Sequence, residues 1–464
     1  MKQINEISSK KILWLLTMIV VSFASCRLTE SYKRPAGMVD NNLYRDANTS
    51  DTANIANLPW KQMFSDSLLQ KLIREGIDNN LDLKIAIARM KQAQANLRQS
   101  KAAFFPTLDV TASGPIINTE KLVSTSTLFE LYAASSWEAD IWGKLRSSKR
   151  AALAAMLQSD AYKKAVQTQL VSDIAIDYYT LMALDAQLEV TLKTLDNRAM
   201  DVEIMKKLKE SDVVTGAAVV QSEANRYSVE VTIPDLKQNI RITENALSIL
   251  LGRAPGSIVR DSLNKQQVWK ELQTGVPILL LANRPDVMEA EYQLRTSFEL
   301  TNVARSYFYP TLTITAAGGF ANDKIAQLFN PSSLFGNIVG ALVAPVFEHG
   351  QNKQRLEVAK AQQEEYLATF KKTILNAGEE VSNALYNYQA ATDKIKIREQ
   401  QISYLQKSVD FTKELLKYTA NTNYTDVLTS EQSLLTAQLN NVSDKEQQLL
   451  ATIALYRSLG GGWK

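Results

Sequence analysis

The sequence predicts a mostly α-helical chain built from one unit repeated twice, with four short amphipathic strands that need further strands to close a sheet. Three observations support this. Apolar residues recur at every seventh position along two segments, the same short motifs occur twice at a nearly constant offset, and each repeat contains two stretches of alternating apolar and polar residues. Seven-residue apolar repeats are typical of supercoiled helices, and alternation is typical of strands with one apolar face.

The N-terminus has the composition of an export signal, which we expect over residues 1–25. Three lysines precede an apolar core at 12–21 that is too short to span a bilayer. Cys26, the only cysteine, follows Ala24 and Ser25, as in a bacterial lipobox, and would then become the acylated N-terminus. The alternative is cleavage after Ala24, which would leave Cys26 as a free thiol.

Internal repeats define the organisation of the chain. Segment 103–108 recurs as 307–312, at an offset of 204 (310 − 106), and segment 221–223 recurs as 429–431, at an offset of 208 (431 − 223). Gly143 pairs with Gly350 at an offset of 207 (350 − 143). A nearly constant offset at distant points indicates one structural unit that has been duplicated.

In chain order, each repeat is predicted to contain a helix, two strands, a very long helix, a turn and a return helix. Residues 26–78, an expected anchor segment, precede the first repeat, and a linker over 253–282 separates the two repeats. Pro234 is expected to kink or break the first return helix. The predicted bounds are 79–252 for the first repeat (strands about 107–141, long helix 144–210, return helix 217–251) and 283–464 for the second (strands about 311–347, long helix 351–418, return helix 424–459).

The two long helices are the features on which the organisation depends. Gly378 is the only glycine between Gly350 and Gly460, and no proline occurs there or between Gly143 and Gly216. A helix over 351–418 would be roughly 100 Å long, more than a compact domain accommodates. An ordinary coiled-coil dimer is an open alternative for this stretch alone. The predicted seams are Ile174, Leu181, Leu188, Leu195 and Val202 in the first helix and Ile374, Val381, Tyr388, Ile395, Ile402, Val409 and Leu416 in the second.

The predicted strands suit a sheet between lipid and water. Leu108, Val110 and Ala112 share one face, and Thr107 and Asp109 lie on the other. A soluble sheet is the alternative, but no amphipathic helix remains to cover its apolar face. Four strands leave two unpaired edges and are too few to close a barrel, for which about eight are needed. The chain is therefore expected to form an oligomer of at least two copies. The strands alone do not determine the exact number of copies.

Composition and motifs argue against nucleic-acid binding and catalysis. The net charge is +3, and basic residues are not clustered among aromatic ones as on a nucleic-acid surface. His349 is the only histidine, so a histidine–cysteine metal cluster is not expected, and no cofactor is predicted. The sequence contains no phosphate loop, dinucleotide fingerprint or nucleophile elbow. We therefore expect a protein that is not an enzyme.

A set of motifs in order resembles the TolC-like outer-membrane efflux family, in the NodT-type lipoprotein branch that serves RND pumps. Its parts are Trp60-x-x-x-Phe64-x-Asp66, Asn80-Leu81-Asp82-Leu83, Trp137-Glu138-x-Asp140-x-x-Gly143, Arg284-Pro285-Asp286-Val287, Ala344-Pro345-Val346-Phe347 and Leu459-Gly460-Gly461-Gly462-Trp463. The resemblance covers essentially the whole mature chain. It implies a homotrimer with a twelve-stranded barrel in the outer membrane, continuous with a helical barrel through the periplasm and an equatorial domain. Residues 26–78 and the linker 253–282 would contribute to this equatorial domain.

The resemblance also implies partners and a gate. A periplasmic adaptor would contact the helix tips at 209–216 and 417–426, and an inner-membrane RND-type transporter would supply the energy. Asn421 tolerates the left-handed conformation of a helix end, whereas Val213 at the equivalent site does not, so a different turn is expected there. The residues expected at the tips are Asp212, Val213, Thr215, Tyr418 and Asn421, and those expected at the gate are Tyr424, Asp426, Thr429, Glu431 and Gln432.

Two further interpretations remain beside the efflux conduit. One is a type I secretion outlet, which shares the fold, and the other is a structural coiled-coil lipoprotein without a pore. The alternating strands favour a barrel over a tether, because a tether does not need them. Asp426 in the first turn of a helix is also consistent with plain stabilisation of the helix dipole rather than with a gate. The sequence does not identify the exported substrate.

Overall fold

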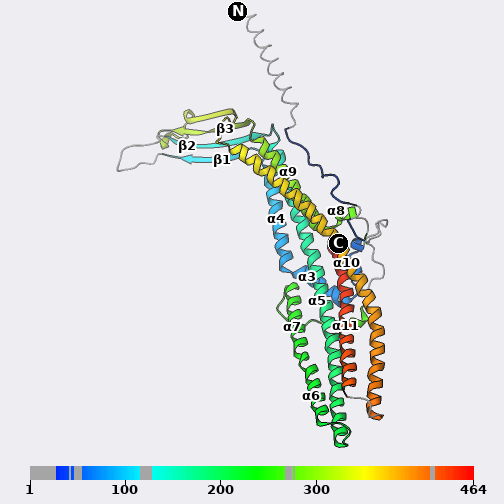
Figure 1. Cartoon of the computed structure of the whole chain (residues 1–464). Coiled ribbons are helices and arrows are strands. Elements are labelled where there is room, and N and C mark those ends of the chain that lie inside the picture. Colours follow the sequence, from blue (N-terminus) through cyan, green and yellow to red (C-terminus); the bar gives the residue numbers. More distant parts are fainter. Residues whose placement is uncertain are drawn as a thin grey trace, which may run out of the picture. The chain divides into compact units, whose positions relative to one another are not determined.

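The computed structural model describes residues 28–40, 43–45, 55–114, 128–266, 274, 277–418 and 424–464 (Figure 1). The chain forms two compact units. We call the first the sheet unit, comprising residues up to Ala36, Arg89–Ser159 and Glu289–Phe370, and the second the helical unit, comprising Gly37–Ala88, Asp160–Met288 and Lys371–Lys464. Each unit takes part of both repeats, so the duplication in sequence does not correspond to two separate bodies.

The sheet unit contains one four-stranded sheet in the order β1-β2-β3-β4, and all neighbouring strands are antiparallel. The strands are β1 Thr107–Ser113, β2 Phe129–Ala139, β3 Thr311–Asn322 and β4 Leu334–Val343. The first repeat supplies β1 and β2, the second supplies β3 and β4, and β2 pairs with β3 between the repeats. Among the described residues, β1 and β4 each have one strand partner, so the sheet has two open edges.

The strand register separates apolar from polar side chains. One row across the sheet joins Leu108, Ser135, Ala316 and Ile338, and an adjacent row on the opposite face joins Asp109, Ala134, Ala317 and Asn337. Because directly paired residues point to the same side, the alternation in each strand adds up to two chemically distinct faces. The edge-strand residues of the apolar face are Leu108, Val110, Ala112, Leu334, Ile338 and Leu342.

The fourth strand ends earlier than the sequence predicted. β4 runs from Leu334 to Val343, whereas the alternation suggested a strand reaching residue 347. Pro345 explains the difference, because proline lacks the backbone N–H that a further ladder bond requires. Val346 and Phe347 therefore lie in the exposed connection that leads to the next helix.

Two very long helices follow the two strand pairs. α5 covers Lys144–Glu210 with 67 residues, and α10 covers Gln351–Tyr418 with 68 residues. The Asp140 carboxylate accepts hydrogen bonds from the backbone N–H groups of Leu145 and Arg146, at 2.9 and 3.1 Å, and so satisfies donors in the first turn of α5. Shorter helices, α4 (Leu81–Ala102) and α9 (Pro285–Ser306), precede the strand pairs.

The predicted heptad seams lie on the buried and half-buried faces of the long helices, and none of their residues is exposed. In α5, Ile174 and Leu181 are fully buried, and in α10 Ile374, Val381 and Val409 are at most 6% exposed. A strict seven-residue step keeps such a stripe facing the neighbouring helix over many turns. This part of the prediction is confirmed.

The two return helices differ. In the second repeat, α11 runs unbroken over Tyr424–Ser458. In the first repeat the return is divided into α6 (Gly216–Glu230) and α7 (Thr232–Leu250), which meet at Val231. The return helix predicted over 217–251 is broken, as Pro234 led us to expect, and the break lies three residues before this proline. Proline is tolerated there because the first turn of α7 has no intrahelical partner for its N–H.

Gly378, the glycine inside α10, marks the crossing of another segment. A Cβ at this position would lie 2.5 Å from Cγ of Leu43, so any larger residue would displace the N-terminal stretch. The backbone N–H of Arg45 donates to Oγ of Ser382 one turn further along the helix, at 2.9 Å. The glycine is therefore required by close packing rather than by a bend in the helix.

Short elements complete the helical unit around an apolar core. They are η1 (Ile55–Asn57), α2 (Trp60–Met63), α3 (Ser67–Asn79), η2 (Leu263–Lys265), η3 (Pro277–Leu279) and α8 (Leu280–Asn283). The sheet unit adds η4 (Ile325–Gln327) and η5 (Pro331–Ser333) between β3 and β4. The largest fully buried side chains of the helical unit include Tyr178, Tyr456, Leu69 and Leu247. None of the described helices carries an apolar stretch long enough to cross a membrane.

Candidate functional site: the helix tips and a buried charge cluster

The turn between α5 and α6 forms one of the predicted tips. Asp212 has the positive φ, at 56°, and the backbone N–H of Val213 donates to the Leu208 carbonyl at 2.9 Å. Aspartate tolerates the left-handed region better than a β-branched residue, so the left-handed position falls on Asp212 instead of Val213. Val213 does not take the left-handed position, as expected, whereas the turn at Asn421 with which it was compared lies outside the described residues. Asp212, Val213 and the N-cap residue Thr215 are all exposed.

Three of the predicted residues lie beyond what the structure describes. Cys26 and Asn421 fall outside the described residues, and the same holds for the side chain of Tyr418, whose backbone ends α10. Their proposed roles therefore remain predictions.

An apolar cluster joins four helices just above the tips. Met205 of α5 packs with Tyr424 and Val427 of α11, and all three are at most 6% exposed. Partly buried residues around them come from α5, α6, α10, α11 and the α5–α6 turn: Leu208, Val214, Ala218, Val219, Leu416 and Leu428. Burial raises the pKa of Tyr424 to about 12, so its hydroxyl is neutral at physiological pH.

A cluster of four charges, three of them buried and the fourth (Lys413) half-buried, lies beside this apolar group. Arg198 of α5 forms an ion pair with Glu431 of α11, and both side chains are buried. Lys413 of α10 lies 2.6 Å from Glu431 and 3.0 Å from Asp201 of α5. Two cations therefore face two carboxylates, and the cluster connects α5, α10 and α11.

The electrostatics of the cluster keep its lysine charged. Burial lowers the pKa of Lys413, but its hydrogen bonds to Glu431 and Asp201 outweigh this effect and leave the pKa above the ordinary value. Removing one partner from such a cluster leaves an unpaired charge away from water, which typically costs about 3–5 kcal/mol. The cluster therefore acts as a strong cross-link as long as all four groups are present.

The five predicted gate residues do not form a single site. Tyr424 and Glu431 point into the buried clusters, whereas Asp426, Thr429 and Gln432 are exposed on another face of α11. The Thr429 hydroxyl donates to the Thr425 carbonyl in its own helix, at 2.9 Å.

Sequence spacing did not identify Arg198 and Lys413, the ion-pair partners of Glu431, or Asp201, which pairs with Lys413. A signal for two of them was present. Arg198 lies three residues after Leu195 and Lys413 lies four residues after Val409, and both Leu195 and Val409 belong to the predicted seams. Charges at such spacing fall on the same face as the seam and therefore need partners.

A cavity of about 610 Å³ extends from the charge cluster between α5, α10 and α11. Arg198, Lys413 and Glu431 line one part of it, and Leu263 and Asn264 of the linker line another. Among the described residues, no group of three histidine, cysteine or carboxylate side chains is arranged to hold a metal ion. His349 precedes α10, and its ring contacts that of Phe347 with 4.8 Å between centroids.

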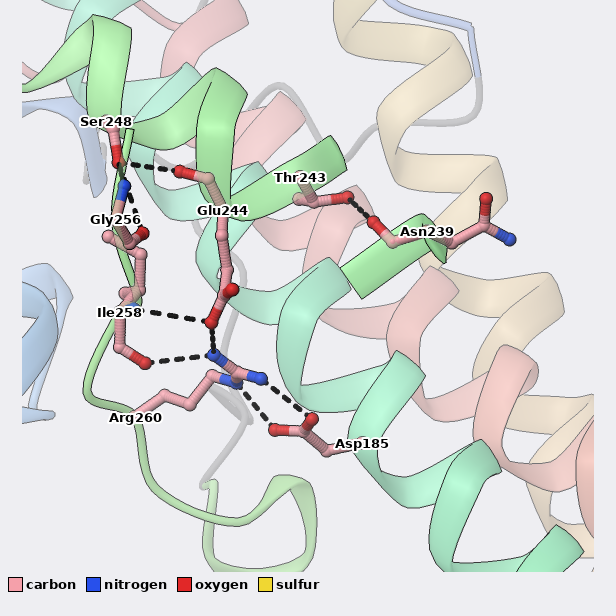
Figure 2. A network of polar contacts seen from close by, with 8 residues as sticks. All are labelled: Asp185, Asn239, Thr243, Glu244, Ser248, Gly256, Ile258 and Arg260. Carbon is pink, nitrogen blue, oxygen red and sulfur yellow. Dashed lines mark hydrogen bonds and ion pairs between the residues drawn. The ribbon is translucent and has the colours of Figure 1, made fainter. Parts of the chain in front are cut away.

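Within the helical unit, a second polar network fixes the linker to α5 and α7 (Figure 2). Arg260 donates through Nε and Nη2 to the carboxylate of Asp185 in α5, at 2.5 and 2.8 Å. Through Nη1 it donates to Glu244 of α7 at 2.7 Å, and Ile258 N–H donates to the same carboxylate at 3.3 Å. These hydrogen bonds, first of all those to Asp185, raise the pKa of Arg260 above its usual value. The network holds the end of α7 that is remote from the tip against α5.

A profile of the outer membrane efflux protein family matches residues 72–253 and 276–461. The chain belongs to this family. The cation efflux system protein CusC of Escherichia coli is 28% identical over 456 residues, covering 96% of this chain and 98% of CusC. The probable efflux pump outer membrane protein TtgC of Pseudomonas putida is 27% identical over 464 residues, covering 97% of this chain and 96% of TtgC.

The solved structures agree with this assignment. A crystal structure of CusC matches with a TM-score of 0.82 at 27% identity, covering 94% of this chain and 100% of the other. The predicted fold class of long helices joined to four barrel strands per chain is confirmed, as is the outer-membrane efflux assignment. The family consists of efflux proteins and is not a family of enzymes.

Proposed function

We propose that this chain is the outer-membrane channel subunit of a tripartite efflux pump and forms a passive conduit from periplasm to exterior as a homotrimer. The observation that carries this proposal is the four-stranded sheet, with its two open edges and its separated apolar and polar faces. Lipid excludes unpaired strand edges, so β1 of one copy would pair with β4 of the next. Three copies would supply twelve strands, which exceeds the practical minimum for closure.

The proposed partners follow from the chemistry that the chain lacks. Members of the family are not enzymes, so energy for transport would come from an inner-membrane RND-type transporter. A periplasmic adaptor would join that transporter to the exposed tip residues Asp212, Val213 and Thr215, and to Tyr418 and Asn421 of the second tip. Disruption of this contact would leave the channel intact but unconnected.

The relatives suggest that the conduit does not select its cargo. CusC is described as a cation efflux protein, TtgC of another Pseudomonas putida strain as a toluene efflux protein, and OpmQ of Pseudomonas aeruginosa as a pyoverdine export protein. All three align with nine-tenths or more of this chain although their cargoes are chemically unlike. We therefore assign the choice of substrate to the transporter.

The charge cluster is the proposed latch of the gate. Arg198 and Asp201 tie α5 to Glu431 of α11 and Lys413 of α10, so moving the second helix pair outward would break these ion pairs first. The exposed residues Asp426, Thr429 and Gln432 would then line the opening, where one copy per subunit forms a ring.

Acylation of Cys26 is the proposed anchor to the periplasmic leaflet of the outer membrane. Support comes from the start of the described chain, because Thr29 packs against Gly143 directly before α5, with 3.1 Å between its side chain and a Cβ built at the glycine. The lipid would therefore be close to the connection between β2 and α5. Mass spectrometry of the mature N-terminus tests this, since replacement of Cys26 by serine would remove the added acyl mass.

Single-channel conductance of the purified protein in planar bilayers tests the conduit. We expect rare or small openings for the parent protein and a sustained conductance for Glu431→Ala combined with Lys413→Ala, which removes the latch. Thr436→Ala, on the exposed face of α11, serves as a control that leaves the latch intact. A trimeric latch variant that does not conduct would refute the conduit and favour a structural envelope lipoprotein. Adaptor and transporter copurification would separate a pump channel from a type I secretion outlet.

A further inference from the structure

A group of basic and aromatic side chains lies where the strands of the sheet unit meet its helices. Lys149 of α5 places its Nζ 5.2 Å from the centre of the Phe104 ring, and Phe105 next to that ring is 73% exposed. Trp137 of β2 donates from its indole N–H to the Phe104 carbonyl at 3.0 Å. The connection between α4 and β1 is therefore held against both α5 and β2. We call Phe104, Phe105, Trp137, Arg146 and Lys149 the rim cluster.

The rim cluster lies on the side of the sheet unit that the N-terminal segment follows. Arg146 and Lys149 are three residues apart on α5 and therefore share one face of the helix. A Cβ built at Gly143 would lie 3.1 Å from the Thr29 side chain and 3.6 Å from Nη2 of Arg146. Cys26, the proposed site of acylation, stands three residues before Thr29. Acyl chains attached there would enter the membrane outside the barrel, so this face of α5 is on the lipid side.

Positive charge is concentrated at this level of the sheet unit. We count the four connections between strands and helices, each with two adjoining helical turns, which are residues 96–106, 140–150, 300–310 and 344–357. They contain nine lysines and arginines and three carboxylates, a net charge of +6 (9 − 3). The four described strands contain no lysine or arginine.

The two cations of the rim cluster differ in their partners. Arg146 pairs with Asp140 at 2.9 Å and keeps 56% of its side chain exposed. Lys149 forms no ion pair with any carboxylate among the described residues, and its described contact is the Phe104 ring. An ammonium group on an aromatic face remains able to bind an anion on its other side. Lys149 is therefore the cation that is available to a ligand.

A shallow groove of about 700 Å³ on the apolar face of the sheet leads to the rim cluster. Its floor is made of small residues of the two central strands, and Leu108 and Ile338 of the edge strands stand at the two ends of the same row. Ser135 in the floor is two residues, or roughly 7 Å, from Trp137 along β2, and both side chains point to the same face. The floor residues are Ala133, Ser135, Ala316 and Gly318.

We propose that the rim cluster and the groove together bind one phospholipid with an anionic headgroup from the periplasmic leaflet of the outer membrane. Lys149 and Arg146 bind the phosphate, and one acyl chain lies in the groove. This inference rests on the proposed conduit, which puts the apolar face of the sheet in lipid. It names the lipid that the barrel binds where its strands leave the membrane.

The dimensions of the site agree with this ligand. Leu108 follows Phe104 by four residues, so the groove begins within roughly 14 Å of the aromatic ring that carries Lys149. An acyl chain spans one leaflet, which is half of a hydrocarbon core about 30 Å thick, or roughly 15 Å. A headgroup at Lys149 therefore allows its acyl chain to lie along the groove.

Charge selects among the possible occupants. A free phosphate ion would use the cations but leave the apolar groove exposed to lipid. A zwitterionic lipid would fill the groove, but its own ammonium group would lie close to Lys149 and Arg146 and be repelled. An anionic phospholipid satisfies both parts of the site, because basic residues near a membrane surface attract anionic headgroups.

Native mass spectrometry of the delipidated trimer in detergent tests the headgroup contact. The probes are phosphatidylglycerol and phosphatidylcholine with the same palmitoyl and oleoyl chains, so that they differ only in the headgroup. We expect the parent protein to bind phosphatidylglycerol more tightly. Lys149→Gln should weaken this binding about fivefold and leave phosphatidylcholine unchanged. Lys149→Arg should retain the preference, and Lys207→Gln, which removes an exposed charge near the other end of α5, is the matched control.

Gly318→Val tests the groove. A Cβ at this position would lie 3.5 Å from the nearest atom, the Phe335 carbonyl oxygen, which is an ordinary contact, so the strand accepts a side chain there. The added methyl groups would enter the groove, and we expect the binding of both lipids to weaken. The two variants thus have different signatures, since Lys149→Gln affects one headgroup and Gly318→Val affects both lipids.

The outcomes separate this inference from the proposed function. Equal binding of the two lipids by the parent protein, or an equal loss of preference in Lys207→Gln, would overturn the site. Should Lys149→Gln not assemble, Lys149→Met replaces it, because methionine keeps an unbranched apolar stem against the Phe104 ring. A trimer that conducts in planar bilayers but shows no preference for phosphatidylglycerol would refute the lipid site and leave the conduit standing. A monomeric parent protein in detergent would refute both.

Discussion

The two return helices come from the same duplicated unit, yet they are held in different ways. α11 lies between α5 and α10, and 14 of its residues are buried, including Leu455 and Tyr456. In contrast, α6 and α7 lie at the edge of the layer and together bury only Ser222, Val229, Ile233, Leu247 and Ser248. The second return is stabilised by apolar burial within the subunit, and the first depends on polar contacts and on the neighbouring copy in the proposed trimer.

This difference shows how one repeated sequence pattern acquires two roles. A helix in the middle of a single layer has neighbours on both sides in its own chain, whereas a helix at the edge has one. The edge helix therefore keeps exposed apolar residues such as Ile249 for assembly, and the central helix carries the charge cluster proposed as a gate. Substitutions in the two helices should consequently affect different properties.

The largest effect is expected in α11. Leu455→Ala removes a fully buried side chain and should lower the free energy of unfolding by about 2–5 kcal/mol, because the cavity is closed on all sides by the subunit. Thermal or chemical unfolding of the detergent-solubilised protein, followed by circular dichroism, measures this loss. A decrease below about 1 kcal/mol would contradict the central packing of α11.

Arg260→Ala should produce the next largest effect, since it detaches α7 from α5. The substitution leaves Glu244 half-buried without its cation, and we expect a loss of about 2 kcal/mol, less than for a fully buried pair because Asp185 reaches solvent. The loss of contact should also speed proteolytic cleavage within 253–266. Arg260→Lys is the matched control, as it keeps the charge but not the paired hydrogen bonds to Asp185. If the parent protein, Arg260→Ala and Arg260→Lys resisted the protease equally, this would argue against a role of the network in holding the linker in place.

Asp177 of α5, the helix that both returns flank, should give a smaller, pH-dependent effect. Burial, followed by the charge of Asp173, raises its pKa from 3.8 to about 6. Between these values the folded chain retains a proton that the unfolded chain releases, so the stability contributed by this group is lost as pH rises through the window. Asp177→Asn should remove that dependence and gain about 1 kcal/mol at pH 7, a value reduced because the half-exposed carboxylate is screened by water. Unfolding midpoints at pH 4–8 test this, and an identical pH profile for both proteins would contradict it.

The smallest effect on subunit stability is expected for Ile249→Ala in α7. Its side chain is 63% exposed, so unfolding of the subunit should change by less than about 0.5 kcal/mol. Assembly should weaken instead, with monomers appearing at a lower detergent concentration or a lower temperature than for the parent protein. Native mass spectrometry measures the trimer fraction. If Ile249→Ala destabilised the subunit but left assembly unchanged, α7 would be stabilised within its own subunit like α11, which would contradict the difference between the two return helices.

Much of the fold was predictable because it rests on local periodicity. The bounds of α5 and α10 agree with the expected helices at 144–210 and 351–418, since neither segment contains a proline and each keeps its apolar residues in seven-residue steps. The β-branched side chain of Val213 alone indicated that this residue does not adopt the left-handed conformation of the turn. The alternating pattern predicted too late an end for β4, at residue 347 instead of Val343, because the alternation continues through Pro345 although the hydrogen bonding does not.

The candidate site was only partly predictable. Glu431 and Tyr424 were selected for their place near a helix tip, but their burial depends on α5, more than 200 residues away: Glu431 pairs with Arg198, and Tyr424 packs on Met205. Asp426, Thr429 and Gln432 follow within one or two turns, yet they face in another direction. Sequence spacing tells which residues share a helix face, and only packing tells what that face meets.

The sequence by itself determined the duplication, the long helices, the two-faced strands and the family, because each depends on spacing and residue type along the chain. The tertiary structure decided which return helix is central and which is at the edge, which charges pair, and where the rim cluster meets an apolar groove. The physical reason is that helix and strand patterns arise from neighbours a few residues apart, whereas burial and ion pairing arise from contacts between segments that the chain brings together only after folding.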